Sequence, residues 1–249
     1  MGMGDRPQER LVPEGLDLMD EWAQTSLAVH RQRYRFAASY AANRRVLDLA
    51  CGIGYGSRIL KNEGGASEVV GLDAAPDAID YARRHYSSEG ISFACAEYET
   101  FSDPAPFGLV CSLETIEHVP DPDDFLIKIS SLIEPGGIFV ASVPVTVSTD
   151  SNPHHLHDFT HRSFKRLLER HGFHPFEQLE QRFAIRYLGH GRVSEALRRV
   201  DKLRLVAYYA RHPLLFGRRM VELVRYGPTN VVLCVAARYR RGNSLQSSS

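Results

Sequence analysis

Three side chains able to bind a metal ion lie within five residues of the sequence. They are Glu114, Glu117 and His118, in the stretch CSLETIEHVPDPDD directly after an apolar run. If the chain makes a helical turn there, positions i, i+3 and i+4 face the same side. Two carboxylates and an imidazole suit Mg²⁺ or Mn²⁺ better than a structural zinc ion. The pattern therefore indicates a divalent-metal site that needs a further ligand, whereas the residues from Pro120 onward are typical of a helix start.

A histidine cluster about forty residues later could complete such a site. Four of the eleven histidines fall between His154 and His161, in SNPHHLHDFTHRSF. Imidazoles are common metal ligands and common general bases. A cluster beside a loop can also be solvated surface, but four so close together favour a functional role for at least one of them.

A glycine-rich turn follows an earlier apolar strand. VLDLACGIGYG holds Gly52, Gly54 and Gly56, with Asp48 inside the strand and Asp73 at the end of the next one. Such glycines let the backbone pass close to a ligand at a helix N-terminus, and an acidic residue about 20 positions on can accept hydrogen bonds from ribose hydroxyls. The offsets are GxGxG and not GxGxxG, which argues against a nicotinamide dehydrogenase. A tight strand-to-helix turn without a ligand is the plainer alternative.

The elements around these residues alternate between strand and helix with short connections. This order predicts an α/β fold, a doubly wound, mostly parallel seven-stranded sheet with a helical insertion before the last strand. The expected elements are a helix over 17–42, a short strand, the glycine turn and a helix start within 44–60, a strand at 69–72, a helix at 76–86, strands within 91–101 and 107–116, a helix within 122–137, strands at 138–144 and 176–183, a helix within 160–173, and a last strand at Thr229–Arg240.

The bulk composition is that of an ordinary soluble protein. Of 249 residues, 43% are hydrophobic, and 30 basic side chains balance 30 acidic ones, so charge does not point to nucleic acid or to a membrane surface. We find no apolar run of about 18 residues and no signal peptide, and expect a cytoplasmic protein without stable membrane insertion. None of the four cysteines lies in a CxxC pair, which favours buried free thiols.

Four regions are expected along the chain. These are an N-terminal arm and lid helix (1–42), a ligand-binding domain (43–186 and 229–240), a helical insertion (187–228) and a disordered tail (241–249). Between residues 192 and 226, nine Arg or Lys side chains outnumber three acidic ones. The insertion could cover a substrate pocket, form a homodimer contact, line a groove for a sugar polymer or touch a membrane surface.

The ordered motifs resemble those of class I S-adenosylmethionine-dependent methyltransferases. VLDLACGIGYG is similar to the first motif of that family, VVGLDAAPDAIDYAR to the second, and SLIEPGGIFVASVP to the helix and strand further on. The resemblance covers roughly residues 30 to 180 and implies an S-adenosyl-L-methionine site. The residues implied to bind this cofactor are Arg33, Tyr34, Asp48, Ala50, Gly52, Gly54, Asp73, Ala74, Glu97, Tyr98 and Leu113. Glu97 departs from the Asp that is usual there.

The ExxEH pattern with a later histidine resembles two metal-using groups of that family, the small-RNA 2′-O-methyltransferases and the ubiquinone-pathway phenol O-methyltransferases. By this resemblance Glu114, Glu117, His118 and His155 would hold Mg²⁺ or Mn²⁺. His154, with His157 as rival, would take the acceptor proton, and Glu117 would count as catalytic. Many members without metal also carry EH here, where it shapes the acceptor pocket or caps a helix.

The acceptor is expected to be a hydroxyl group of a sugar or an oligo- or polysaccharide. The order of HRQRYRFAA, VLDLACGIGYGS and NPHHLHDFT resembles bacterial methyltransferases of sugar and polysaccharide pathways. The alternatives are a phenolic or other small secondary metabolite and, in another class, a non-catalytic S-adenosylmethionine-binding regulator. RNA is a weaker candidate because the chain lacks a basic footprint.

Overall fold

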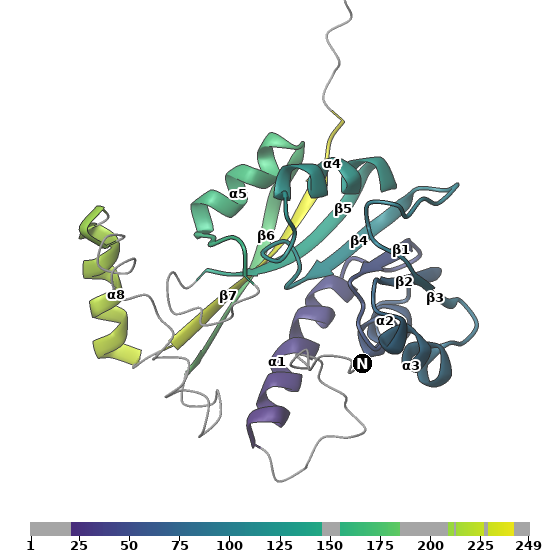
Figure 1. Ribbon diagram of the computed structural model, residues 1–249, viewed down its shortest axis with the longest axis horizontal. Helices are drawn as coiled ribbons and strands as arrows, with labels where there is room; N and C mark the ends of the chain where they lie inside the picture. Colours follow the sequence, from purple (N-terminus) through teal and green to yellow (C-terminus); the bar gives the residue numbers. More distant parts are fainter. Residues whose placement is uncertain (1–20, 146–154, 185–208, 212, 227–228, 242–249) are drawn as a thin grey trace, which may run out of the picture.

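A seven-stranded sheet organises the computed structural model, which describes residues 21–145, 155–184, 209–211, 213–226 and 229–241 (Figure 1). The strand order is β3-β2-β1-β4-β5-β7-β6. The elements are α1 (Glu21–Ala38), β1 (Arg45–Leu49), α2 (Tyr55–Asn62), β2 (Glu68–Asp73), α3 (Pro76–Tyr86), β3 (Ile91–Cys95), β4 (Phe107–Leu113), α4 (Pro122–Leu132), β5 (Ile133–Pro144), α5 (His161–Arg170), β6 (Phe173–Ala184), α8 (Pro213–Tyr226) and β7 (Thr229–Tyr239).

The first five strands are parallel to one another, and β7 alone runs opposite to the rest of the sheet. β7 pairs antiparallel with both β5 and β6. All seven residues of β4 are buried, as expected for a central strand that is covered on both faces. The predicted doubly wound α/β fold is confirmed. The order in which successive strands are added reverses between β1 and β4, and such switch points are where open α/β sheets bind ligands.

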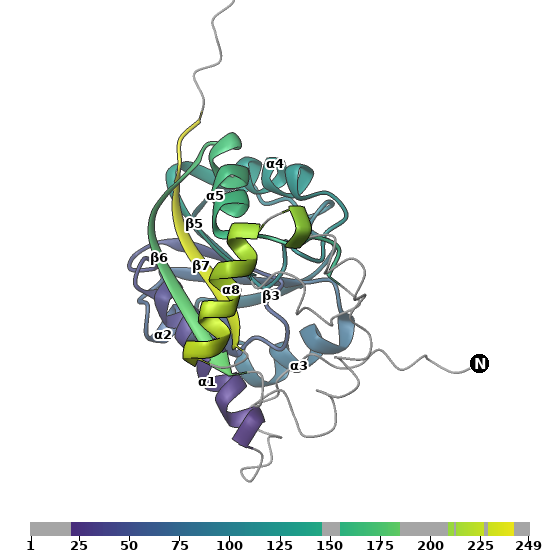
Figure 2. The same ribbon diagram turned by 90° about the vertical axis from the view of Figure 1, so that its left-hand side faces the viewer.

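Two layers of helices cover the two faces of the sheet. α1, α2 and α3 pack on one face and α4 and α5 on the other, as Figures 1 and 2 both show. Each layer has its own apolar cluster, with Ile59 and Ile79 in the first and Phe125 and Phe164 in the second. Burying these faces supplies the main driving force for folding and fixes the strand ends that carry the site.

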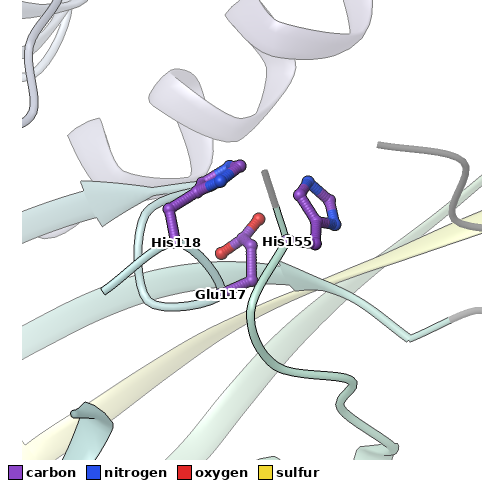
Figure 3. A group of neighbouring side chains, drawn as sticks. All are labelled: Glu117, His118 and His155. Carbon is purple, nitrogen blue, oxygen red and sulfur yellow. The ribbon is translucent and has the colours of Figure 1, made fainter. Parts of the chain in front are cut away.

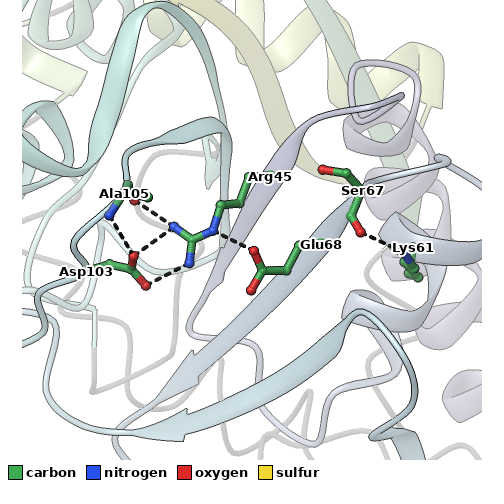
Figure 4. A network of polar contacts seen from close by, with 6 residues as sticks. All are labelled: Arg45, Lys61, Ser67, Glu68, Asp103 and Ala105. Atoms are coloured by element: carbon green, nitrogen blue, oxygen red, sulfur yellow. Dashed lines mark hydrogen bonds and ion pairs between the residues drawn. The ribbon is translucent and has the colours of Figure 1, made fainter.

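The amino ends of the strands are held by a charged network away from the glycine turn. Arg45, the first residue of β1, donates to Asp103 at 2.8 and 2.9 Å and to Glu68 at 2.6 Å (Figure 4). Its guanidinium also lies over the Phe107 ring. Nearby, Lys61 donates to the carbonyl oxygen of Ser67 at 2.8 Å. These contacts join β1, β2 and the loop before β4, so the opposite, carboxyl ends are left to bind ligands.

Several predicted boundaries differ from those observed. The described part of the first helix is Glu21–Ala38, so it ends four residues before position 42. β5 begins at Ile133 and not at 138, because Ile133 already pairs with Phe107 of β4. The helix start after Pro120 is confirmed, since the Asp121 side chain caps α4 by accepting from the N–H groups of residues 123 and 124.

The cysteine prediction is right at three positions and wrong at one. Cys51, Cys111 and Cys234 are buried free thiols, whereas Cys95 is free but exposed. Cys95 is the last residue of β3, an edge strand that has a neighbouring strand on one side only.

The terminal and inserted regions are described only in part. The arm 1–20, most of the insertion 187–228 and the tail 242–249 lie outside the described residues. Within the insertion the structure describes residues 209–211 and the helix α8. None of the helices in the described ranges has the length and apolar character needed to cross a membrane.

Candidate functional site

The glycine turn between β1 and α2 is held by the carboxylate at the end of β2. The backbone N–H of Gly52 donates to Asp73 at 2.8 Å, and the N–H of Ala75 donates to the other oxygen at 2.9 Å. Gly54 has φ 91°, and a Cβ there would lie 2.7 Å from the Phe93 ring. Glycine is therefore required at position 54, and Asp73 ties the turn to the start of the next helix.

A second carboxylate lies beneath the turn and is fully buried. Asp48 accepts from the hydroxyl of Ser57 at 2.6 Å and from that of Tyr34 at 3.2 Å. Burial raises the pKa of Asp48 to about 7, although the two hydroxyl donors oppose the shift. A Cβ at Gly56 would lie 1.9 Å from the Tyr34 ring, so this glycine makes room for the tyrosine. Asp48 thus anchors α1 and α2 from below the turn.

One face of α1 carries the polar contacts to this region. His30, Arg33 and Tyr34 occupy positions i, i+3 and i+4 of the helix. The Nδ1 of His30 shares a hydrogen bond with the hydroxyl of Tyr55, the first residue of α2, and both rings pack against Tyr34. Burial, with a smaller effect from Arg33, lowers the pKa of His30 to about 3, so this imidazole is neutral at physiological pH.

Glu114 sits at the end of β4 and faces α1. Its Oε1 lies 3.2 Å from Nη1 of Arg33 and accepts from the hydroxyl of Ser142 at 3.1 Å. Its backbone N–H donates to both the hydroxyl and the carbonyl oxygen of Ser142, and it has φ 52°, which non-glycine residues rarely adopt. The structure therefore places Glu114 apart from the other metal-binding candidates.

Glu117, His118 and His155 converge beyond that strand end (Figure 3). One ligand atom from each lies within 4.8 Å of the others, close enough for a single ion to bridge them. The rings of His118 and His155 meet edge to face with centroids 4.5 Å apart. Glu117 is fully buried and the two histidines are half-buried, and buried carboxylates are characteristically paired or bound to metals. This donor set fits a divalent cation.

Backbone hydrogen bonds bring the distant histidine segment to this turn. The N–H groups of Leu156 and His157 donate to the carbonyl oxygen of Glu117 at 2.8 and 3.2 Å. The Nε2 of His157 lies 2.9 Å from the carbonyl oxygen of Val119, so this ring is held as a donor to the backbone. His154, the other candidate base, lies outside the described residues.

The remaining predicted cofactor residues lie along the carboxyl ends of the central strands. Ala50 follows β1 with φ 61°, Ala74 is exposed after β2, and Leu113 is the buried last residue of β4. Glu97 is exposed after β3, and Tyr98 packs edge to face on Phe125. Burial raises the pKa of Tyr98 to about 12, so its hydroxyl stays protonated.

Four residues near the site were missed at the level of the sequence. His30 could have been found from its helical spacing to Arg33 and Tyr34. No spacing signal marks Tyr55, Ser57 or Ser142, whose roles depend on contacts between elements far apart in the chain.

Comparison with known proteins agrees with this geometry. Residues 47–141 match a family model described as a methyltransferase domain. The chain is similar to a ubiquinone biosynthesis O-methyltransferase of Xylella fastidiosa, 36% identical over 42% of this chain and 44% of that protein. It is also similar to a Mycolicibacterium smegmatis protein named "Probable S-adenosylmethionine-dependent methyltransferase", 30% identical over 66% of this chain and 63% of that protein. The chain thus spans less than two thirds of the length of these curated relatives.

A solved structure with the same fold is that of the N-methyltransferase NodS from Bradyrhizobium japonicum in complex with S-adenosyl-L-homocysteine. It superposes with a TM-score of 0.57 over 90% of each chain at 16% identity, which shows a shared fold. The chain therefore shares the fold of that methyltransferase, and its residues 47–141 match a methyltransferase domain.

Proposed function

We propose that the protein is an S-adenosylmethionine-dependent O-methyltransferase that uses Mg²⁺ or Mn²⁺. The observation that supports this proposal is the convergence of Glu117, His118 and His155 at the carboxyl edge of the sheet, one strand from the glycine turn. The match to a methyltransferase domain and the similarity to O-methyltransferases support the reaction type.

The cofactor would occupy the carboxyl ends of β1 and β2 and supply an electrophilic methyl group on a sulfonium ion. Asp73 holds the turn through Gly52, and each carboxylate oxygen can accept a further hydrogen bond, as ribose hydroxyls require. The buried Arg33 would take the anionic end of the cofactor. Enclosure by α1 would hold the methyl group and the acceptor in a fixed orientation, which removes much of the entropic barrier.

The ion would be held by Glu117, His118 and His155, and when bound it would lower the pKa of an acceptor hydroxyl. The buried carboxylate of Glu117 supplies the negative charge that such an ion needs, and the two imidazoles must be neutral to bind it. His154, next to His155 in the chain, is the base that we propose for the acceptor proton. His157 is a weaker candidate because its Nε2 is engaged with a backbone carbonyl.

The leading acceptor is a hydroxyl of a sugar or an oligo- or polysaccharide, on the strength of the motif order in the sequence. A phenolic hydroxyl is the second candidate, and the similarity to ubiquinone biosynthesis O-methyltransferases over about two fifths of the chain favours it.

Turnover of a panel of sugar and catechol acceptors, with and without EDTA, tests this proposal. We expect S-adenosylhomocysteine formation with at least one hydroxyl acceptor, its loss with chelator and its recovery with Mg²⁺. Full activity in EDTA would contradict the metal assignment. Cofactor binding without turnover on any acceptor would favour a non-catalytic regulator. Retained activity in a His154→Ala, His157→Ala double variant would contradict the choice of base.

A further inference from the structure

Glu114 belongs to the same ExxEH pattern as the metal donors but makes different contacts. Its carboxylate approaches Arg33 at 3.2 Å and Ser142 at 3.1 Å, whereas the donor cluster within 4.8 Å consists of Glu117, His118 and His155. The turn after β4 is not helical: the N–H of His118 bonds to the carbonyl oxygen of Thr115, three residues back, in an isolated turn. The helical spacing that would align Glu114 with Glu117 is therefore absent here.

The backbone of Glu114 is fixed in the orientation that serves Arg33. Ser142 of β5 is fully buried and pairs in register with Leu113. It accepts the Glu114 N–H at its hydroxyl oxygen and carbonyl oxygen and donates its hydroxyl proton to the Glu114 carboxylate. This clamp holds Glu114 at φ 52°, a conformation that surrounding contacts must maintain in a non-glycine residue.

The buried guanidinium of Arg33 requires the Glu114 carboxylate as its counter-charge. Its side chain is 7% exposed, and burying a guanidinium without a counter-charge is costly. If Glu114 turned to bind a divalent ion, the arginine would lose its anionic partner. Among the described residues, neither Nε nor Nη1 of Arg33 has a hydrogen-bond partner, and the contact of Nη1 with Glu114 is an ion pair at 3.2 Å, so donors of the buried cation remain for an anionic ligand group.

We infer that Glu114 is a positioning residue for Arg33 in the cofactor site and not a ligand of the metal ion. This inference rests on the proposed function and refines it: the ion has three protein donors, and the first Glu of the pattern serves the cofactor. The ion then keeps more coordination positions for the acceptor and water, as a catalytic metal site requires.

Direct binding measurements on the full chain test this division. Glu114→Gln removes the charge and keeps the size of the side chain. We expect its dissociation constant for S-adenosylhomocysteine, measured by calorimetry, to rise about tenfold or more, equivalent to about 1.4 kcal/mol. We expect its Mn²⁺ dissociation constant, measured by electron paramagnetic resonance, to stay within about twofold of the unmodified protein. His118→Asn should show the reverse pattern.

A coupling measurement separates this role from a general structural one. Arg33→Met should weaken S-adenosylhomocysteine binding as Glu114→Gln does, and the double variant should be no weaker than the worse single variant, because both remove one interaction. Arg33→Met also tests the pairing if Glu114→Gln folds poorly. Glu134→Gln, a carboxylate near Gly108 at the amino ends of the strands, is the matched control and should change neither constant.

The inference is overturned if Glu114→Gln weakens Mn²⁺ binding about tenfold, or if it leaves S-adenosylhomocysteine binding unchanged. If the unmodified protein binds no Mn²⁺ and Glu114→Gln still weakens S-adenosylhomocysteine binding, the pairing stands and the metal part of the proposed function fails.

Discussion

The side of the sheet that we propose for the cofactor and the side that we propose for the acceptor are built in different ways. On the cofactor side, carboxylates hold the β1–α2 turn and the start of α2: Asp73 binds Gly52, 21 residues away, and Asp48 binds Ser57, 9 residues away. On the acceptor side, His118 and His155 meet only because a later segment crosses back to the Glu117 carbonyl oxygen. The first side is a local motif on a rigid turn, whereas the second is an assembly of two distant segments.

This difference suggests how each side tolerates change. A glycine turn held by backbone hydrogen bonds fails when its shape is altered, while a side-chain cluster fails when one donor atom is lost. Variants that affect one side and spare the other therefore test whether the two are separate units.

The largest effect is expected on the acceptor side. His155→Asn removes one donor from the cluster and leaves the glycine turn intact. Loss of a residue that only hydrogen-bonds a metal ligand reduces activity by up to about 100-fold, so loss of a ligand itself should reduce turnover by more than that. The dissociation constant for S-adenosylhomocysteine, measured by calorimetry, should stay within about twofold. A matching loss of cofactor binding would show that the two sides are not separable.

Gly56→Ala should disrupt the packing of the cofactor side and not that of the acceptor side. The added Cβ would lie 1.9 Å from the Tyr34 ring and push it away from Asp48. We expect a loss of about 1–3 kcal/mol in the free energy of unfolding, as for overpacked cores, and weaker cofactor binding. Gly217→Ala in α8 is the control, since nothing lies within 4 Å of the new atom. Denaturant titrations that show equal stability for both variants would contradict this account.

Asp48→Asn tests the buried carboxylate of the cofactor side through the pH dependence of stability. Burial raises the folded-state pKa of Asp48 from 3.8 to about 7, so the stabilisation present at low pH is lost as pH rises through about 7, because the buried carboxyl must ionise. The melting temperature of the unmodified protein should therefore fall relative to that of Asp48→Asn between about pH 4 and pH 8. About 1 kcal/mol corresponds to about 2–4 °C for a chain of this size. Parallel pH curves for the two proteins would be evidence against a buried, uncharged Asp48.

The smallest effect concerns the helices that support the histidine segment. Asp123 at the start of α4 bonds His171 at 2.7 Å and Arg170 at 2.9 Å at the end of α5. The hydrogen bond to His171 lowers the pKa of Asp123, so its stabilisation is present above the ordinary carboxyl pKa and is lost in acid below about pH 4. Asp123→Asn should cost about 0–1 kcal/mol at pH 7, because the carboxylate is half exposed. A larger loss in thermal unfolding would mean that this joint contributes more than a surface ion pair.

Much of the fold could be predicted because the patterns involved are local. Alternating apolar strands and amphipathic helices indicated the doubly wound sheet, and the Asp-Pro stretch after residue 120 indicated the start of α4. Boundaries such as the early start of β5 could not be predicted, because Ile133 is a strand residue only through its pairing with Phe107.

By itself the sequence determined the fold class, the glycine turn with its acidic partner Asp73, and the set of residues able to bind a metal. Only the tertiary structure decided how that set divides: Glu117 and His118 join His155, and Glu114 turns to Arg33. The reason is that spacing fixes neighbours along one element, while partners are chosen by strand register, by the Ser142 clamp and by the need of a buried arginine for a counter-charge.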